Sequence, residues 1–266
     1  MSEPTIRLIA FTTALLGMLA WEFLAPKRTP LRSRLQRWPA NLGIVLVDSL
    51  LLRLLFPAAA VGIALWAESS RLGLFNWIAL PTWLGLLVSL LALDIAIYFQ
   101  HRFLHHFRPL WPLHRMHHSD VDFDVSTGLR FHPAEILISM LWKALAITAL
   151  GAPALAVLIF EIVLNATSLF NHGNVRMPQA LDRALRAVLV TPDMHRVHHS
   201  IDPREHHSNF GFCLSWWDRL FGTYTAQPLE GHLHMKIGQT VFRNPAESGL
   251  LRLLTQPFRK PDRSVV

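Results

Sequence analysis

The longest stretch without a charged side chain, residues 72–93, constrains the fold of this chain more than any other feature. About 20 consecutive apolar residues form a helix long enough to cross the ~30 Å hydrocarbon core of a bilayer. The whole sequence is 52% hydrophobic and only 16% charged, against about 25% charged residues in soluble domains. We therefore predict an all-α integral membrane protein.

Two earlier apolar segments, residues 8–26 and 42–67, are predicted as further spans, which gives about three transmembrane helices before the histidine-rich part of the chain. The loop between these two segments carries five positive charges and no acid. Positive charges of this kind favour the cytoplasmic side, so the N-terminus is predicted outside. Because the charges follow the first segment, it resembles an uncleaved helix more than a signal peptide. The five residues are Lys27, Arg28, Arg32, Arg34 and Arg37.

Residues 134–170 are predicted to form a helical hairpin. A single helix of this length would measure ~55 Å, too long for one crossing of the bilayer. The sequence Gly151-Ala152-Pro153 lies in the middle, where a helix is expected to break. Arms over 134–150 and 153–170 would return the chain to the side from which it came. The segments before and after the hairpin could then meet.

Eight histidines fall into three short clusters, one H-x-x-x-H and two H-x-x-H-H. Residues three or four apart share a helix face, so each cluster directs its imidazoles toward one point. Imidazole binds Zn, Cu, Fe and Ni, and eight ligands exceed the roughly four to six that one ion takes. We predict two metal ions in a cytoplasmic, histidine-rich helical cap. Solvated surface histidines would not explain the repeated spacing. The predicted ligands are His101 and His105; His114, His117 and His118; and His195, His198 and His199.

Two polar stripes run along predicted helices toward these clusters. The first contains Asp94 and ends at His105; the second contains Asn165 and ends at His172. Polar groups are costly in lipid and should face the interior of the bundle, which makes His172 a ninth ligand candidate. A carboxylate near a metal-bound histidine commonly fixes its tautomer. The candidates for such supporting roles around the ligands are Asp94, His132, Asn165 and Asp193.

Several stretches together resemble the fatty acid hydroxylase/sterol desaturase superfamily of membrane enzymes. They are HRFLHHFRPLWPLHRMHHSD, LRFHPAE, NHGN, TPDMHRVHHS and NFGFCLSWWDRLFGTY, and they cover about residues 85–225. The resemblance implies two iron ions held mostly by histidine, which use O2 and external electrons to hydroxylate or desaturate a lipid such as a sterol or fatty acyl chain. All three clusters match ligand positions of the family, and His172 matches a further one. His106, His206 and His207 fall outside the motif positions.

The sequence contains no electron-carrying domain. The single cysteine, Cys213, cannot hold a Cys-ligated iron–sulfur cluster, and Phe131-His132-Pro133 lacks the glycines that follow in a cytochrome b5 haem motif. The resemblance therefore implies a separate donor, of ferredoxin or cytochrome b5 type with its reductase. The net charge of +7 sits largely in one loop and indicates membrane orientation, not nucleic-acid binding.

Two other functions remain compatible with the residues alone. A zinc-dependent membrane hydrolase would use a metal-activated water, but it needs fewer histidines, and no H-E-x-x-H occurs. A metal-binding or transport protein would need ligands along the membrane path, whereas the clusters lie at the predicted cytoplasmic ends of the spans. We treat residues 1–266 as one membrane domain, with N-terminal spans over 1–76, a catalytic core over 77–226 and a C-terminal tail over 227–266.

Overall fold

The structure, a computed structural model, describes residues 1–78 and 80–260 of the chain. The predicted uncharged span crosses residue 79 and the predicted tail runs to residue 266, so these parts of the two predictions lie outside the described residues. Within the described ranges the protein is helical and has only isolated β-bridges instead of a sheet. The predicted all-α fold class is confirmed.

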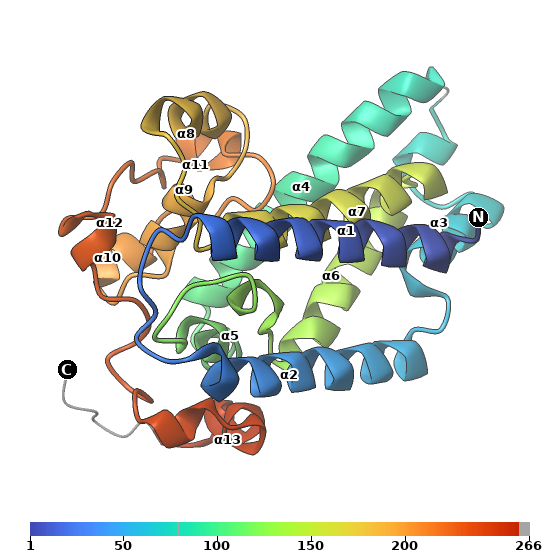
Figure 1. Cartoon of the computed structure of the whole chain (residues 1–266). Coiled ribbons are helices and arrows are strands. Elements are labelled where there is room, and N and C mark those ends of the chain that lie inside the picture. The colour runs from blue at the N-terminus through green and yellow to red at the C-terminus, as the bar shows by residue number, and fades with distance from the viewer. Residues whose placement is uncertain (79, 261–266) are drawn as a thin grey trace.

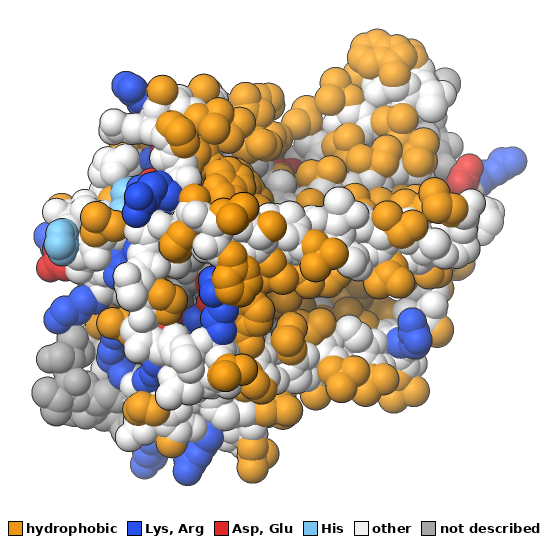
Figure 2. All heavy atoms as spheres, in the orientation of Figure 1, with side chains coloured by type: hydrophobic (Ala, Val, Ile, Leu, Met, Phe, Trp, Pro, Cys, Tyr) orange, Lys and Arg blue, Asp and Glu red, His pale blue; other side chains and the backbone are white. Residues whose placement is uncertain are grey.

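Five segments of the described chain are long and apolar enough to cross a membrane. Their large side chains are widely exposed, as at Leu46, Leu54 and Leu145, and Figure 2 shows hydrophobic side chains spread over the long helices. Such a surface is stable in contact with lipid tails, so the chain is an integral membrane protein. The long helices are α1 (Glu3–Leu24), α2 (Arg34–Leu55), α4 (Thr82–His106), α6 (Pro133–Leu150) and α7 (Ala154–Asn171).

The helical hairpin forms as predicted, with α6 and α7 as its arms. Gly151 ends α6 in the left-handed conformation, at φ 65°, which glycine adopts without a steric penalty. A side chain there would also lie 2.7 Å from the Asn76 amide nitrogen and 2.9 Å from the Leu72 carbonyl oxygen. Pro153 then precedes the first residue of α7. Gly151 therefore allows the left-handed turn, and Pro153 sets the start of the second helix.

Two predicted spans have different boundaries in the structure. The segment 42–67 is not one helix: α2 ends at Leu55 and α3 (Ala59–Ser69) follows, because Pro57 lacks the amide hydrogen that a continuous helix requires. The segment 72–93 begins with a turn that contains the short helix η1 (Leu74–Asn76), and α4 starts only at Thr82, after Pro81. Absence of charge therefore indicated lipid contact but not where the helix begins.

Helix α7 lies at the centre of the bundle and packs against α1, α3 and α4. Small side chains such as Ala60, Ala64 and Ala156 are fully buried, which lets neighbouring helices approach closely where lipid supplies no hydrophobic driving force. Helix α6 packs against α3 and α4 in the same way. The result is a rigid frame that fixes the ends of α4 and α7.

The short helices form a cap at one end of this bundle, opposite the end that holds α3 and the N-terminus (Figure 1). The described part of the predicted tail packs onto the cap and α2: the Leu254 carbonyl lies 3.0 Å from His132 Nε2, and the Gln256 amide donates to Ser119. The division into three parts stays a prediction. The cap helices are α5 (Trp111–His118), α8 (Gln179–Arg186), α9 (Pro192–His198), α10 (Pro203–His206), α11 (Trp216–Leu220), α12 (Gly231–His234) and α13 (Leu250–Thr255); the 3₁₀ turns are η2 (Thr127–Leu129), η3 (Pro245–Ser248) and η4 (Gln256–Phe258).

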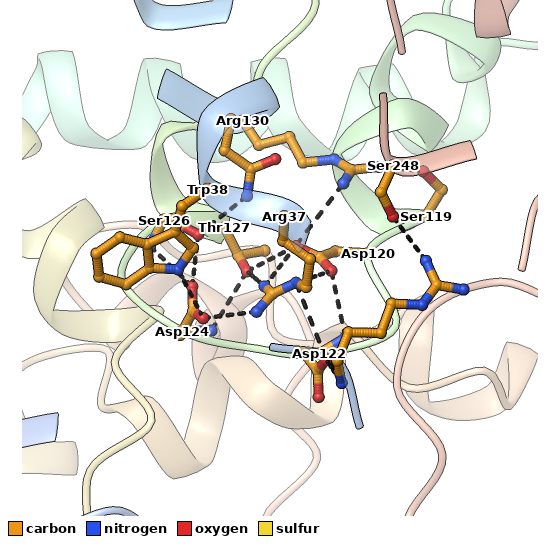
Figure 3. A network of polar contacts seen from close by, with 12 residues as sticks. Arg37, Trp38, Ser119, Asp120, Asp122, Asp124, Ser126, Thr127, Arg130 and Ser248 are labelled. Atoms are coloured by element: carbon orange, nitrogen blue, oxygen red, sulfur yellow. Dashed lines mark hydrogen bonds and ion pairs between the residues drawn. The ribbon is translucent and has the colours of Figure 1, made fainter. Parts of the chain in front are cut away.

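The basic loop that suggested membrane orientation is tied to the cap by ion pairs. Arg37 is fully buried and donates to both carboxylate oxygens of Asp120, at 2.7 and 2.6 Å, and to Asp124 at 2.6 Å (Figure 3). Lys27 similarly pairs with Asp193 at 2.9 Å. These positive charges therefore stabilise the fold whichever side of the membrane they face. The cytoplasmic location of the cap stays a prediction.

Candidate metal centre

The first histidine cluster lies on the last two turns of α4. Because this helix is continuous from Thr82 to His106, His101 and His105 share one face and both are buried. His101 Nδ1 donates to the Phe210 carbonyl at 2.8 Å. Its Nε2 then faces inward, 3.1 Å from Nε2 of His114.

The second cluster lies on α5, which begins with Trp111-Pro112 at the positions where proline favours a helix start. His114 Nδ1 donates to Glu135 Oε1 at 2.7 Å, and His117 Nδ1 donates to the Arg130 carbonyl at 3.0 Å. These two contacts fix the orientations of both rings. The loop that follows α5 is held in place by Arg37, which donates to Asp120 and Asp124.

The third cluster lies on α9, where the Thr191 side chain caps the helix by accepting from the Met194 amide. His198 Nδ1 donates to the Ser208 carbonyl at 2.7 Å. His172 follows the last residue of α7 and donates from Nδ1 to the Ser168 carbonyl at 2.8 Å. The returning arm of the hairpin thus delivers His172 to the cap.

The structure brings all nine predicted ligands together, in two adjoining groups. Within each group, one candidate ligand atom per residue lies within 4.8 Å of the others, and every member is buried. The groups draw on residues before and after the hairpin, which agrees with the argument that the hairpin must return the chain. One group contains His101, His105, His114, His118 and His198; the other contains His117, His172, His195 and His199.

The protonation pattern fits a cation in each group. His101 Nδ1 faces the Phe210 carbonyl, which only accepts, and His114 Nδ1 faces Glu135 Oε1; with both Nδ1 atoms protonated, both Nε2 atoms present lone pairs, 3.1 Å apart. His117 and His172 repeat this arrangement at 3.2 Å. Two facing lone pairs repel unless a cation accepts both. The residues present therefore fit two metal ions bound through nitrogen.

Burial keeps these imidazoles neutral, which is the form that binds metals. It lowers the pKa of His114 and of His172 to about 3. The pKa values of His117, His195 and His198 also fall well below the ordinary histidine value, first through desolvation and then through neighbouring histidines. At neutral pH the ligands need not lose protons to bind a metal.

Asp94 does not contact a histidine, contrary to its expected supporting role. Its carboxylate accepts from the backbone amides of Cys213 and Leu214, at 3.3 and 3.1 Å, and from the Trp217 indole at 2.7 Å. It therefore anchors the segment that follows Phe210, whose carbonyl orients His101. The carboxylate beside a metal-binding histidine is instead Glu135, which the sequence analysis missed although it stands in the motif LRFHPAE.

The other expected supporting residues also lie away from the two groups. His132 caps α6 by accepting from the Ala134 amide, and its second nitrogen lies 3.0 Å from the Leu254 carbonyl. Asp193 pairs with Lys27 and Arg196. Asn165 donates to the Glu161 carbonyl and lines a cavity. These residues stabilise the surroundings of the histidines instead of touching them.

A cavity of about 700 Å³ reaches the first group from the membrane-spanning part of the molecule. Side chains of α1, α2, α4, α6 and α7 line it, most of its lining surface is apolar, and His101 and His114 form part of its wall. Phe131 also lines it and stacks on His117 at a centroid distance of 4.5 Å. An elongated apolar molecule in this cavity would reach the histidines without crossing water.

His206 and His207, which match no motif position, lie beside the first group. Candidate ligand atoms of His105, His206 and His207 fall within 4.8 Å of one another. His207 is exposed, and the ring of His106 lies 5.3 Å from it. Spacing along the chain gave no signal of this contact, because it is created by the packing of α10 against the end of α4.

Comparison with known protein families identifies the histidine-rich half of the chain. The model of the fatty acid hydroxylase family matches residues 86–223, which include all nine histidines. The chain belongs to the fatty acid hydroxylase family. The superfamily predicted from the motifs is thereby confirmed.

Among curated proteins, this family member is similar to the ornithine lipid hydroxylase OlsE of Rhizobium tropici, with 31% identity over 183 residues, or 69% of this chain and 52% of the relative. It is also similar to the alkylglycerol monooxygenase of Homo sapiens, with 28% identity over 170 residues, 62% of this chain and 35% of the relative. The chain thus matches between a third and about half of the length of these relatives. No solved structure matches.

Proposed function

We propose that this fatty acid hydroxylase family member hydroxylates a membrane lipid with two iron ions, O2 and electrons from a separate donor. One oxygen atom would enter a lipid C–H bond and the other would leave as water, with two electrons and two protons consumed. The observation that carries the proposal is the pair of buried histidine groups beside an apolar cavity. Relatives named as a lipid hydroxylase and a monooxygenase favour hydroxylation over desaturation.

Oxidation suits this ligand set better than hydrolysis does. A metal-dependent hydrolase needs a general base near its metal-bound water. Among the described residues, Glu135 is the one carboxylate paired with a histidine of either group, and it orients the imidazole of His114. Two iron ions, when bound, would supply the reductive activation of O2 that side chains cannot perform.

The protein's own residues would hold the lipid and keep water away. The cavity walls would position an alkyl chain against His101 and His114. Backbone carbonyls of Phe210, Arg130 and Ser168 would keep the imidazoles oriented while the charge of the centre changes. A cap on the cytoplasmic side would meet a ferredoxin or a cytochrome b5 type donor in solution or at the membrane.

Metal content and lipid oxidation test this function together. We expect about two irons per chain in gently purified protein and O2-dependent conversion of an added lipid to an alcohol. His198→Ala and His172→Ala, one from each group, should lower bound iron and abolish turnover. His106→Ala is the matched control, because His106 is exposed and lies outside both groups.

One zinc per chain without oxidation, persisting after reconstitution with ferrous iron, would favour the hydrolase instead. Wild-type turnover in either His198→Ala or His172→Ala would contradict the assignment of these ligands.

A further inference from the structure

Three hydrogen-bond acceptors in the cavity wall have no partner. Asp48 Oδ1, Gln100 Oε1 and Glu135 Oε2 are buried atoms that accept no hydrogen bond from the described residues. A buried acceptor that is left unpaired loses the hydrogen bonds that water would supply, so it is destabilising until a donor reaches it. Because all three belong to residues that line one cavity, the cavity is suited to a ligand that donates hydrogen bonds.

Asp48 is the least compensated of the acids that line the cavity. Glu161 pairs with Lys143 and Arg7, at 2.7 Å each, and Glu135 accepts from His114. Asp48 is 7% exposed and has no ion-pair or hydrogen-bond partner among residues 1–78 and 80–260. Arg53 lies on the same helix and also lines the cavity, but it forms no ion pair with Asp48.

These acceptors lie close to the metal-binding histidines. Glu135 contacts His114, and Gln100 directly precedes His101 on α4. Asp48 lines the same cavity as these two residues. The substrate atoms nearest the centre would therefore meet oxygen atoms that lack a hydrogen-bond partner, and the apolar remainder of the cavity would hold the hydrocarbon chain.

This arrangement discriminates between lipid classes. A carboxylate head group would bring a further acid beside Asp48 and Glu135 and, like an ester, it offers acceptors but no hydrogen-bond donor. A hydroxyl group can donate one hydrogen bond, and an ammonium can donate three and also carries the compensating charge. The patch therefore favours an ammonium most strongly.

We propose that Asp48, with Gln100 and Glu135, binds an ammonium-bearing part of the lipid substrate close to the carbon that is oxidised. The proposal rests on the proposed function in taking a lipid as substrate. Asp48 belongs to α2, outside the segment matched by the family model. Substrate choice would then depend on an N-terminal helix that packs beside the histidine-containing segment shared with the family.

Competition binding to the full-length, iron-loaded protein in detergent tests this assignment. Tritiated hexadecylamine would be displaced by unlabelled hexadecylamine, hexadecan-1-ol, palmitic acid or hexadecane, without O2 or reductant. We expect the amine to bind most tightly and the alcohol next. Asp48→Asn should weaken amine binding about 10-fold or more, as for loss of a hydrogen bond to a charged group, and should change hexadecane binding little.

Asp48→Ser is a second variant that removes the carboxylate. Asp202→Asn is the matched control, because this substitution makes the same chemical change in an exposed ion pair with Arg204. Iron per chain is measured on each preparation. Equal displacement by all four lipids, or an unchanged amine preference in Asp48→Asn, would overturn the proposal. Loss of iron together with the preference would also overturn it, since Asp48 would then balance the charge of the centre. The binding assay needs no turnover, so its result can be interpreted even if the protein fails to oxidise lipids.

Discussion

Glu135 shows how single side chains can prepare the histidines for metal binding. Its Oε1 accepts the Nδ1 proton of His114, which leaves Nε2 of that ring free for a metal. Four other imidazole rings donate from Nδ1 to backbone carbonyls in the same way; the carbonyls are those of Phe210, Arg130, Ser168 and Ser208. Orientation at the residue scale thus depends mostly on oxygen atoms whose positions only the folded backbone defines.

Replacement of Glu135 by alanine should weaken metal retention roughly 10- to 100-fold, the usual cost of losing a group that orients a ligand. Glu135→Gln should retain most of the affinity, because its amide oxygen still accepts from His114. The measurement is the rate of iron loss to a chelator. Equal rates for alanine, glutamine and wild type would show that Glu135 does not orient His114.

The histidine spacing sufficed to predict which residues would meet, because two helical periods and a repeated motif are local properties. It could not predict their supports. Asp94 shares a helical stripe with His101, yet packing turns its carboxylate toward the backbone of Cys213 and Leu214. Glu135 is far along the chain from His114, and only tertiary packing brings the two together.

At the scale of elements, helix boundaries followed prolines and glycines more closely than charge. The hairpin was predictable because Gly151 and Pro153 mark its turn. Pro57 divides the predicted second span, and Pro81 delays the start of α4. The contact between α2 and the loop after α5 had no local signal, since Arg37 was one of several equivalent basic residues in the sequence.

Arg37→Leu should lower the free energy of unfolding by about 3–5 kcal/mol, because it leaves the buried carboxylate of Asp124 without its cation and Asp120 with only Arg130, at 3.8 Å. Iron retention should fall as well, since the loop that Arg37 holds directly follows His117 and His118 at the end of α5. Thermal unfolding in detergent measures the first effect. Arg204→Leu is the control, as it removes only an exposed pair, which contributes little to stability. Similar losses for both variants would argue against the buried network.

The whole molecule divides into a lipid-exposed bundle and a polar cap at one end, with most of the visible Lys and Arg over the cap (Figure 2). Sequence hydropathy predicted this division, and the need for the last cluster to rejoin the first predicted its topology. Hydropathy did not predict that Lys27, Arg34 and Arg37 of the basic segment form ion pairs. Orientation in the membrane must therefore be measured directly.

Cysteine labelling makes that measurement. Cys213 is buried, so a membrane-impermeant thiol reagent should report on a single introduced cysteine. Arg204→Cys in the cap should be labelled from the cytoplasmic side, and Glu68→Cys at the end of α3 from the opposite side. Both positions are exposed. The reverse pattern would overturn the cytoplasmic location of the cap.

The order of the ligands along the chain has a consequence for how the protein is made. His195 and His199 are synthesised after all five apolar segments, and each metal-binding group needs a member of that last cluster. Neither group is complete while the ribosome is still producing the hairpin. Insertion into the bilayer would then proceed before either group is complete, and metal loading would be a late step of maturation that depends on the supply of metal when the finished chain folds its cap.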